Sequence, residues 1–455
     1  MELLGTLHGF LWGPWMLALF LGTGVWLTIR LRGFQLRHPG VWWGRTVGGI
    51  GTGGERERKQ LRTACTALAA TVGTGNIAGV ATAIAAGGPG AVFWMWVSAL
   101  LGMATAYGEV VLGVRYRLRC RREGGEELWL GGPFLYLERG LKSQNAGKVY
   151  SSFCLLASLG MGSMVQANSI SDSFSTVFTV PPLLTAMLVA LLAGAVILGG
   201  IRRISEVAVR LVPVSAGLYL LLCGMVLLCN VIRLPQLLLQ ILQEACSVSG
   251  MAGGAAGYGM TRAIRYGVAR GVFSNEAGLG SLAILHSSSE DSTEEEQGMW
   301  AIFEVFFDTM VSCTLTAFVI LCMGKNQQGE GSALVAACFG RFFGAFGGWM
   351  TAVSMALFAF ATIIAWFYLG QQAVTYLFYK KRGGSSQKSA LRFYGICYLG
   401  AVFLGGIARL ELVWELSDLF NGLMAVPNLA ALLLLSGQIR PPKQKKRQNK
   451  MPLQQ

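Results

Sequence analysis

Two glycine-rich segments, TVGTGNIAGV (Thr71–Val80) and FSNEAGLGS (Phe273–Ser281), interrupt long apolar runs, one in each half of the chain. A membrane helix satisfies its backbone hydrogen bonds internally, so glycines and amides at membrane depth predict unwound backbone that faces a polar cavity. Free N–H groups at the start of a half-helix suit an anion, and free carbonyls at the end of the preceding half-helix suit a cation. The two breaks therefore predict a solute carrier.

The first break places Gly73 and Gly75 on either side of Thr74, and Asn76 follows before the helical pattern resumes. This arrangement suits a substrate carboxylate. The alternative is that small residues merely allow close helix packing. We prefer that alternative for Gly79 and the binding-site interpretation for residues 73–76.

The second break places Asn275 and Glu276 directly after the apolar run that ends near Phe273. A buried carboxylate costs several kcal/mol unless it is paired or solvated. Glu276 either faces the cavity or caps the start of the next half-helix, and the sequence does not separate these two interpretations. The segment GGAAGYG (Gly253–Gly259) is a competing candidate for the second break. Its alternative interpretation is a loop that leads into the span.

The composition places most of the chain in lipid. Hydrophobic residues make up 53% and charged residues 13%, with a mean hydropathy of +0.52, which excludes an ordinary soluble domain. Ten apolar runs and the broken segment Ala252–Leu285 predict an all-α integral membrane protein with about eleven transmembrane helices. If the first run, Phe10–Ile29, is set aside, the other ten form two sets of five, and each set begins with a glycine-rich break. An odd number per set places the halves in opposite orientations, which predicts an inverted repeat.

This division predicts five regions along the chain. They are an extra N-terminal transmembrane helix at 1–31, a basic cytoplasmic loop at 32–61, a first five-helix repeat at 62–232, a second at 233–437 and a basic cytoplasmic tail at 438–455.

The formal net charge of +14 is concentrated in alternate loops, at 30–62, 115–122, 202–210, 380–388 and 440–450. By the positive-inside rule, this distribution predicts an outside N-terminus and a cytoplasmic C-terminus. The acidic stretch 290–296 is an exception, because it falls on the side predicted to be cytoplasmic. Nucleic-acid binding is disfavoured, since the cations do not line one soluble face, and the tail is expected to be disordered near anionic lipid.

Other functional classes receive less support from the sequence. We find no nucleophile–base pair, no metal cluster with ligand spacing and no phosphate loop, so neither an enzyme nor a cofactor is expected. His8, His38 and His286 are far apart and near span ends, which predicts surface histidines. A channel, or a membrane protein that binds an amino acid without transporting it, would use similar broken helices and remains an alternative.

Five ordered motifs resemble those of the alanine or glycine:cation symporter family, and the resemblance runs nearly end to end. They are TVGTGNIAGVATAIAAGGPGAVFWMWVSALLGMA, GGPFLYLERGL, MVQANS, AIRYGVARGVFSNEAGLGS and LVWELSDLFNGLMAVPNLAALLLLSG. The resemblance implies a LeuT-like 5+5 inverted repeat with discontinuous helices plus one added N-terminal helix. It also implies sodium-driven symport of small neutral amino acids such as alanine or glycine by alternating access in the cell membrane. A monomer is expected, and an oligomer is the alternative.

The family's substrate site falls on positions that match its motifs: Thr74, Gly75, Asn76, Gln166, Phe273, Asn275 and Trp366. The resemblance implies that the first three hold the amino-acid carboxylate and that Gln166 is a polar wall contact. Phe273 and Trp366 resemble aromatic lids around the side-chain space, and such a small pocket fits a methyl group or a hydrogen. Without the resemblance, ordinary apolar packing is the preferred interpretation of both aromatics.

The family's sodium site combines carbonyls of the first broken helix, here at Gly73, with two hydroxyls on the eighth core helix. This chain has Thr362 at the second hydroxyl position, but Ala361 replaces the serine that the family usually carries at the first. The loss of one oxygen ligand implies weaker sodium binding unless a carbonyl or water replaces it.

Three acids are candidate coupling carboxylates. Glu276 lies in the second break, and Glu304 lies four residues before the family-like Asp308, so these two are expected to share a helix face. Relatives usually carry a small or polar residue in place of Glu304. Because close carboxylates retain a proton more readily, a proton that replaces or supplements sodium is the alternative coupling ion.

Overall fold

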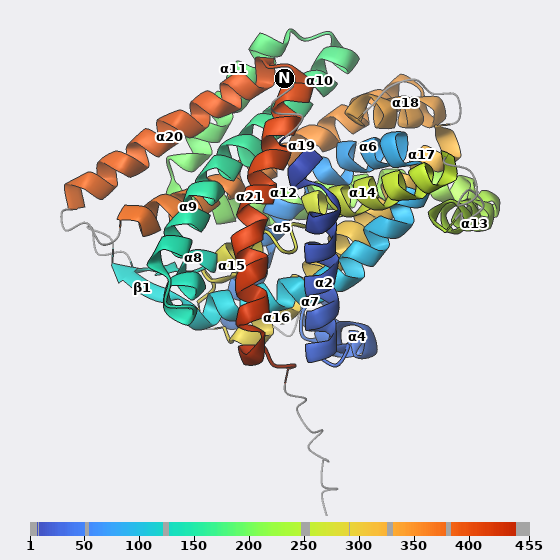
Figure 1. Cartoon of the computed structure of the whole chain (residues 1–455). Helices are drawn as coiled ribbons and strands as arrows, with labels where there is room; N and C mark the ends of the chain where they lie inside the picture. The colour runs from blue at the N-terminus through green and yellow to red at the C-terminus, as the bar shows by residue number, and fades with distance from the viewer. Residues whose placement is uncertain are drawn as a thin grey trace, which may run out of the picture.

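The computed structural model describes residues 7, 9–50, 54–121, 127–246, 255–290, 292–324, 331–378 and 384–442. Within these residues the structure is helical, except for a short antiparallel hairpin of β1 (Leu118–Arg121) and β2 (Glu127–Leu130) and the connecting loops (Figure 1). Most of the predicted tail 438–455 lies outside the described residues.

Helix α2 packs against helix α21. α2 (Pro14–Arg30) and α21 (Leu410–Leu434) contact each other, and both end at the bottom of Figure 1. The Trp12 indole N–H donates to the Asp418 carbonyl at 2.9 Å, and the Arg30 guanidinium donates to the Ser436 carbonyl at 3.1 Å. Trp12, just before α2, is thus tied to α21, and Arg30 at the end of α2 is tied to η7.

The first half contains the first break. Its helices are α3 (Phe34–Arg37), α4 (Pro39–Gly44), η1 (Val47–Gly49), α5 (Glu55–Thr71), η2 (Thr74–Asn76), α6 (Ala78–Gly87), α7 (Gly90–Tyr116), α8 (Pro133–Leu135), η3 (Tyr136–Gly140), α9 (Gln144–Leu159), η4 (Gly160–Val165), α10 (Gln166–Phe178), α11 (Pro182–Ile197), α12 (Gly200–Cys229), η5 (Val231–Arg233) and α13 (Leu234–Ala245).

The second half contains the second break. Its helices are α14 (Ala255–Asn275), α15 (Ser281–His286), α16 (Glu294–Val305), η6 (Phe306–Cys313), α17 (Thr314–Met323), α18 (Gly331–Phe343), α19 (Ala345–Phe378), α20 (Gly384–Ile407), α21 and η7 (Ser436–Gln438). Three segments, η3, η4 and η6, are π-helical and the other η segments are 3₁₀.

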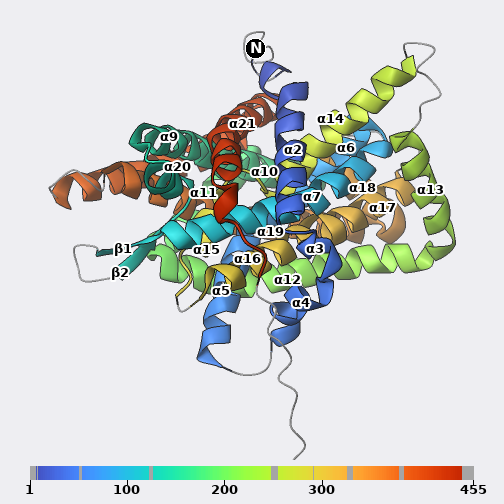
Figure 2. The ribbon, with the colours of Figure 1, turned by 60° about the horizontal axis from the view of Figure 1, so that its bottom comes forward.

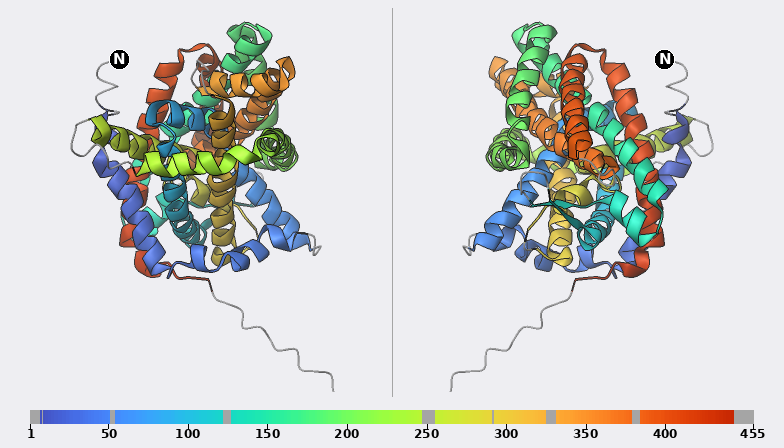
Figure 3. Two further views of the ribbon diagram at one scale, coloured as in Figure 1. Left: turned by 90° about the vertical axis from the view of Figure 1, so that its right-hand side faces the viewer. Right: turned by 90° about the vertical axis from the view of Figure 1, so that its left-hand side faces the viewer.

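Seven helical segments of the described chain are long and apolar enough to cross a membrane, so this is a multi-pass membrane protein. They are Gly90–Tyr116, Gln144–Phe178, Gly200–Cys229, Glu294–Met323, Ala345–Phe378, Ser386–Ile407 and Glu411–Leu434. In α7 and α19, 78% of the most apolar stretch is buried inside the protein, whereas in α20 only 28% is buried. Accordingly, α7 and α19 form the core and α20 lies at the periphery (Figures 2 and 3).

Both predicted breaks are interruptions of helices. The chain leaves helical geometry between Thr71 and Ala78, apart from one 3₁₀ turn, and again between Asn275 and Ser281. The competing break at Gly253–Gly259 is not supported, because α14 is continuous from Ala255, while residues 253–254 lie outside the described part. The packing interpretation of Gly79 is wrong, since a Cβ there would meet nothing within 4 Å.

Candidate functional site

The two breaks touch each other at Gly75 and Ser274. A Cβ on Gly75 would lie 2.9 Å from the Cα of Ser274, which is closer than real Cβ contacts. Only glycine therefore lets the 3₁₀ turn η2 lie against the last turn of α14. The sequence predicted that the broken helices meet, and here their backbones are in direct contact.

Asn76 connects the first break to η6. Its Oδ1 accepts a hydrogen bond from the Gly73 N–H at 3.0 Å, and its Nδ2 donates to the Asp308 carboxylate at 2.6 Å. The Thr316 hydroxyl donates to the Asn76 carbonyl at 2.7 Å. All these side chains are buried, so one amide both closes the unwound turn and fixes it to the neighbouring helix.

Gln166 faces the same turn from α10. Its Oε1 accepts from the Thr74 N–H at 3.4 Å, and its Nε2 donates to the Met161 carbonyl at 3.1 Å. The π-helical segment η4 ends at the residue before Gln166, and its wider turn sets the direction of this side chain. The buried Thr74 hydroxyl has no hydrogen-bond partner among the described residues, so it is free to bind a small polar ligand.

Thr362 lies where α5 ends. Its hydroxyl donates to the Ala69 carbonyl at 3.0 Å and to the Phe358 carbonyl at 3.2 Å. A Cβ on Gly73 would lie 2.5 Å from this hydroxyl, so Gly73 and Thr362 are adjacent. Hydroxyl and carbonyl oxygens at the end of a half-helix are ligands that suit Na⁺. Ala361, beside Thr362, is fully buried and supplies no side-chain oxygen.

Glu276 and Trp366 form a buried pair in the second break. The indole N–H of Trp366 donates to Glu276 Oε1 at 2.8 Å, and Glu276 adopts a left-handed backbone with φ +57°. Glu276 Oε2 has no partner among the described residues. Trp366 therefore orders the break through a polar contact as well as through its apolar surface.

The other two predicted substrate residues of the second break contact different helices. Asn275 Nδ2 donates to the Thr309 hydroxyl at 3.1 Å, and its Oδ1 accepts from the Ala277 N–H at 3.0 Å. Phe273 instead packs on Trp414 of α21, with ring centroids 4.9 Å apart. Phe273 and Trp366 are thus positioned by different elements, and the Asn275 amide is engaged by protein groups at both ends.

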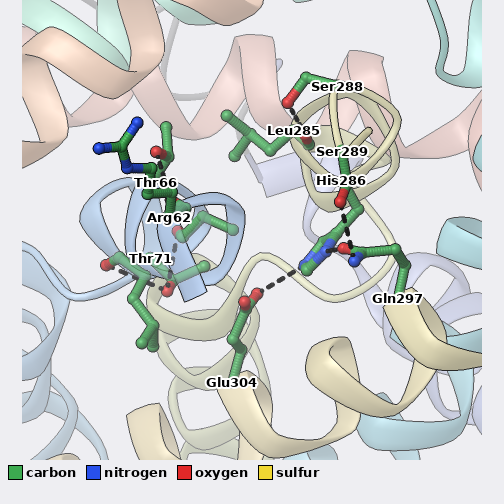
Figure 4. A network of polar contacts seen from close by, with 11 residues as sticks. Arg62, Thr66, Thr71, Leu285, His286, Ser288, Ser289, Gln297 and Glu304 are labelled. Carbon is green, nitrogen blue, oxygen red and sulfur yellow. Dashed lines mark hydrogen bonds and ion pairs between the residues drawn. The ribbon is translucent and has the colours of Figure 1, made fainter. Parts of the chain in front are cut away.

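Glu304 and Asp308 have separate partners. Glu304 Oε2 lies 3.0 Å from His286 Nε2, and His286 Nδ1 lies 2.6 Å from Gln297 Oε1 (Figure 4). Asp308, by contrast, accepts from Asn76 and, at 2.8 Å, from the Thr309 hydroxyl. The prediction of a surface histidine is wrong for His286, which is fully buried, because the carboxylate that the sequence singled out provides its partner.

Sequence reasoning missed Glu109 of α7. Its Oε2 accepts from the Gly280 N–H at 3.0 Å and from Asn428 Nδ2 at 2.9 Å. Glu109 therefore binds the backbone at the start of α15, and Glu276 binds Trp366. The signal was present in the sequence, because Glu109 is an acid inside the apolar run Val92–Val114, and such residues are expensive in a membrane.

Known proteins of similar sequence are membrane transporters. The model of the sodium:alanine symporter family matches residues 1–451. The sodium/alanine symporter AgcS of Methanococcus maripaludis is 39% identical over 96% of this chain and 95% of its own length. The amino-acid carrier protein AlsT of Bacillus subtilis is 34% identical over 94% of this chain and 88% of its own.

A solved structure shares the overall fold at low sequence identity. The manganese transporter of Eremococcus coleocola, crystallised with an aromatic bis-isothiourea substituted compound, aligns with a TM-score of 0.53 and 14% identity, over 85% of this chain and 81% of its own. The family and the named relatives consist of transporters rather than enzymes. On the match over nearly its whole length, the chain belongs to the sodium:alanine symporter family.

Proposed function

We propose that the protein is a secondary active transporter that couples sodium influx to the uptake of small neutral amino acids, such as alanine or glycine, by alternating access. The observation that carries this proposal is the buried turn at residues 73–76, where Thr74, Asn76 and Gln166 converge against the end of α14. The relatives AgcS and AlsT, named as an alanine symporter and an amino-acid carrier, support the substrate class.

In this proposal the amino-acid carboxylate binds at the first break, where the Thr74 hydroxyl has no hydrogen-bond partner among the described residues. The N-terminal end of a half-helix favours an anion there. Gln166 lines the polar wall, and Phe273 and Trp366 limit the space for the side chain. Asn275 acts by holding the second break against Thr309.

Sodium is proposed to bind between the end of α5 and α19, with the Gly73 backbone and the Thr362 hydroxyl among its ligands. The adjacency of Thr362 to Gly73 and to the Ala69 carbonyl supports this position. Ala361 supplies no hydroxyl, so a weaker sodium site than in relatives with serine is expected.

The proposed architecture has eleven spans in a LeuT-like 5+5 inverted repeat preceded by the α2 span, with the N-terminus outside and the C-terminus cytoplasmic. Two ion pairs support a common side for the acidic stretch 290–296 and the basic loops. Lys59 lies 3.5 Å from Glu290, and Arg115 lies 2.5 Å from Glu294. In this proposal, local pairing accounts for the acidic exception to the positive-inside rule. A monomer suffices for this arrangement.

A proton is the alternative coupling ion, and the His286–Glu304 pair favours it. Histidine and glutamate together can hold or release a proton inside the protein, and Glu304 Oε1 has no partner among the described residues. In this alternative the same amino acids are transported.

Uptake by the purified protein in sealed liposomes tests both versions. We expect labelled alanine to accumulate under an inward sodium gradient without a pH gradient, and an excess of unlabelled glycine to compete. If a pH gradient drives accumulation in the absence of sodium, the coupling ion is a proton and not sodium. Alanine binding without accumulation under either gradient would overturn the transporter proposal.

A further inference from the structure

An apolar cleft opens between the helices α10, α11, α12 and α19. Its volume is about 610 Å³, and its lining residues are Ile170, Phe174, Val180, Leu184, Thr185, Leu188, Val189, Leu192, Ala195, Val196, Arg203, Ala356, Leu357 and Phe360. Apart from Thr185 and Arg203, these side chains are apolar. The cleft is separate from the breaks that form the candidate transport site.

The cleft is elongated along α11. Leu184, Leu188 and Leu192 recur every four residues, so they share one face of this helix, and they remain 52%, 55% and 49% exposed. From Leu184 to Val196 the helix rises about 18 Å, which is more than half of the roughly 30 Å hydrocarbon core. A long apolar surface that runs along an apolar helix matches an extended acyl chain.

Arg203 provides the charge at one end of the cleft. Its aliphatic stem crosses the turn between α11 and α12, where a Cβ on Gly199 would lie 2.3 Å from Arg203 Cδ. Within the described residues no ion pair or hydrogen bond engages its guanidinium, whereas the neighbouring Arg202 lies 3.4 Å from Glu206. A guanidinium at the polar end of an apolar cleft suits a phosphate group.

We propose that the cleft binds one anionic glycerophospholipid, with an acyl chain along α11 and its phosphate on Arg203. The inner wall is formed by Ala356, Leu357 and Phe360 of α19, and Thr362 lies two residues beyond Phe360. The bound lipid therefore supports the helix that carries Thr362. This inference does not depend on the transported substrate.

Lipid binding can be measured on the purified full-length protein in detergent with phosphatidylglycerol as the probe and phosphatidylethanolamine as the zwitterionic comparison. The head-group variant is Arg203→Gln, and its matched control is Arg202→Gln, which removes the same charge one residue away from the cleft. Ala195→Trp fills the cleft from α11, where Ala195 is exposed. Arg203→Lys keeps the charge and reports on folding together with size-exclusion profiles.

We expect wild type, Arg202→Gln and Arg203→Lys to retain about one phosphatidylglycerol per protein in native mass spectrometry, consistent with charge-dependent lipid binding. Arg203→Gln and Ala195→Trp are each expected to lower retention several-fold. Equal retention by Arg203→Gln and Arg202→Gln, or equal retention of phosphatidylethanolamine, would overturn the head-group assignment. Undiminished retention by Ala195→Trp would overturn binding of the chain in the cleft.

Discussion

Asn76 and Asp308 lie 232 positions apart in the sequence and are joined by a hydrogen bond of 2.6 Å between Nδ2 and Oδ1. The same amide accepts from the Gly73 N–H. The geometry of the first break is therefore set jointly by its own backbone and by η6. A rearrangement of η6 during transport would be transmitted to the turn at residues 73–76 through this amide.

The first prediction concerns this bond. Asn76→Ala removes the acceptor for Gly73 and the donor to Asp308. A lost hydrogen bond to a charged group costs about 1.5–3 kcal/mol, or roughly 10- to 150-fold in the apparent affinity for alanine. We expect concentrative uptake in liposomes to disappear while the protein remains monodisperse in detergent.

The reciprocal exchange, Asn76→Asp with Asp308→Asn, provides the control. It keeps one amide donor and one carboxylate acceptor across the contact, whereas each single change leaves two like groups facing each other. Partial recovery of uptake in the exchanged pair, relative to both single variants, is expected. If the exchanged pair is as inactive as Asn76→Ala, the role assigned to this contact is wrong.

The second prediction separates the two ends of the Gln166 amide. Gln166→Ala is expected to abolish uptake, because the Thr74 N–H loses its acceptor and the polar wall is lost. Gln166→Glu keeps an acceptor for Thr74 but loses the donor to the Met161 carbonyl, so it should retain measurable uptake with a raised KM for alanine. Unchanged uptake in Gln166→Ala would exclude this residue from the site.

The third prediction concerns the ion. Ala361→Ser restores a hydroxyl beside Thr362 and should lower the sodium concentration for half-maximal uptake several-fold. Thr362→Ala removes the hydroxyl that lies on the Ala69 carbonyl and should raise that concentration. Both variants are measured by titrating sodium at saturating alanine. If the sodium concentration for half-maximal uptake changes in neither variant, the sodium site lies elsewhere.

The positions of the two helix breaks were predictable, because the residues that indicate them are neighbours in the sequence. Glycines beside Thr74 and Asn76 in an apolar run indicate unwound backbone without any knowledge of neighbours. The meeting of the halves followed from the count of spans and the family motifs. In the structure, Gly75 against Ser274 and Gly73 against Thr362 are in close contact.

The partners of the carboxylates were less predictable, because they depend on contacts between distant helices. Glu304 and Asp308 share a face only in a regular α-helix, and the π-helical segment η6 begins between them. The sequence could not show that His286 reaches Glu304 or that Glu109 reaches the Gly280 N–H. An acid within an apolar run indicates that a partner exists without identifying it.

The fourth prediction uses two glycines with opposite surroundings. Gly280 has φ +85°, and a Cβ there would lie 2.3 Å from Pro133 Cγ, so Gly280→Ala should abolish folding or lower the thermal midpoint strongly. Gly79→Ala is the matched control in α6, where a Cβ meets nothing within 4 Å. There, the gain in helix propensity of about 0.5–1 kcal/mol should leave the midpoint unchanged or raised. Equal loss in both variants would contradict this account.

The fifth prediction concerns the stability contributed by the His286–Glu304 pair. His286→Ala leaves a fully buried carboxylate without its partner, which costs about 3 kcal/mol or more, whereas His286→Gln and Glu304→Gln each retain a hydrogen-bonding side chain. We expect the apparent free energy of unfolding in mixed micelles to fall most for His286→Ala. The double change His286→Gln with Glu304→Gln should lower the free energy of unfolding by less than the two single changes added together, because it leaves no buried charge.

Transport by the same variants distinguishes a structural pair from a proton site. If the pair is structural and sodium is the coupling ion, the double change should still accumulate alanine under a sodium gradient, with the same response to external pH as wild type. If the pair carries the coupling proton, Glu304→Gln should lose accumulation driven by a pH gradient while it still binds alanine. Additive stability effects together with unchanged transport would show that the 3.0 Å contact contributes neither coupling nor appreciable stability.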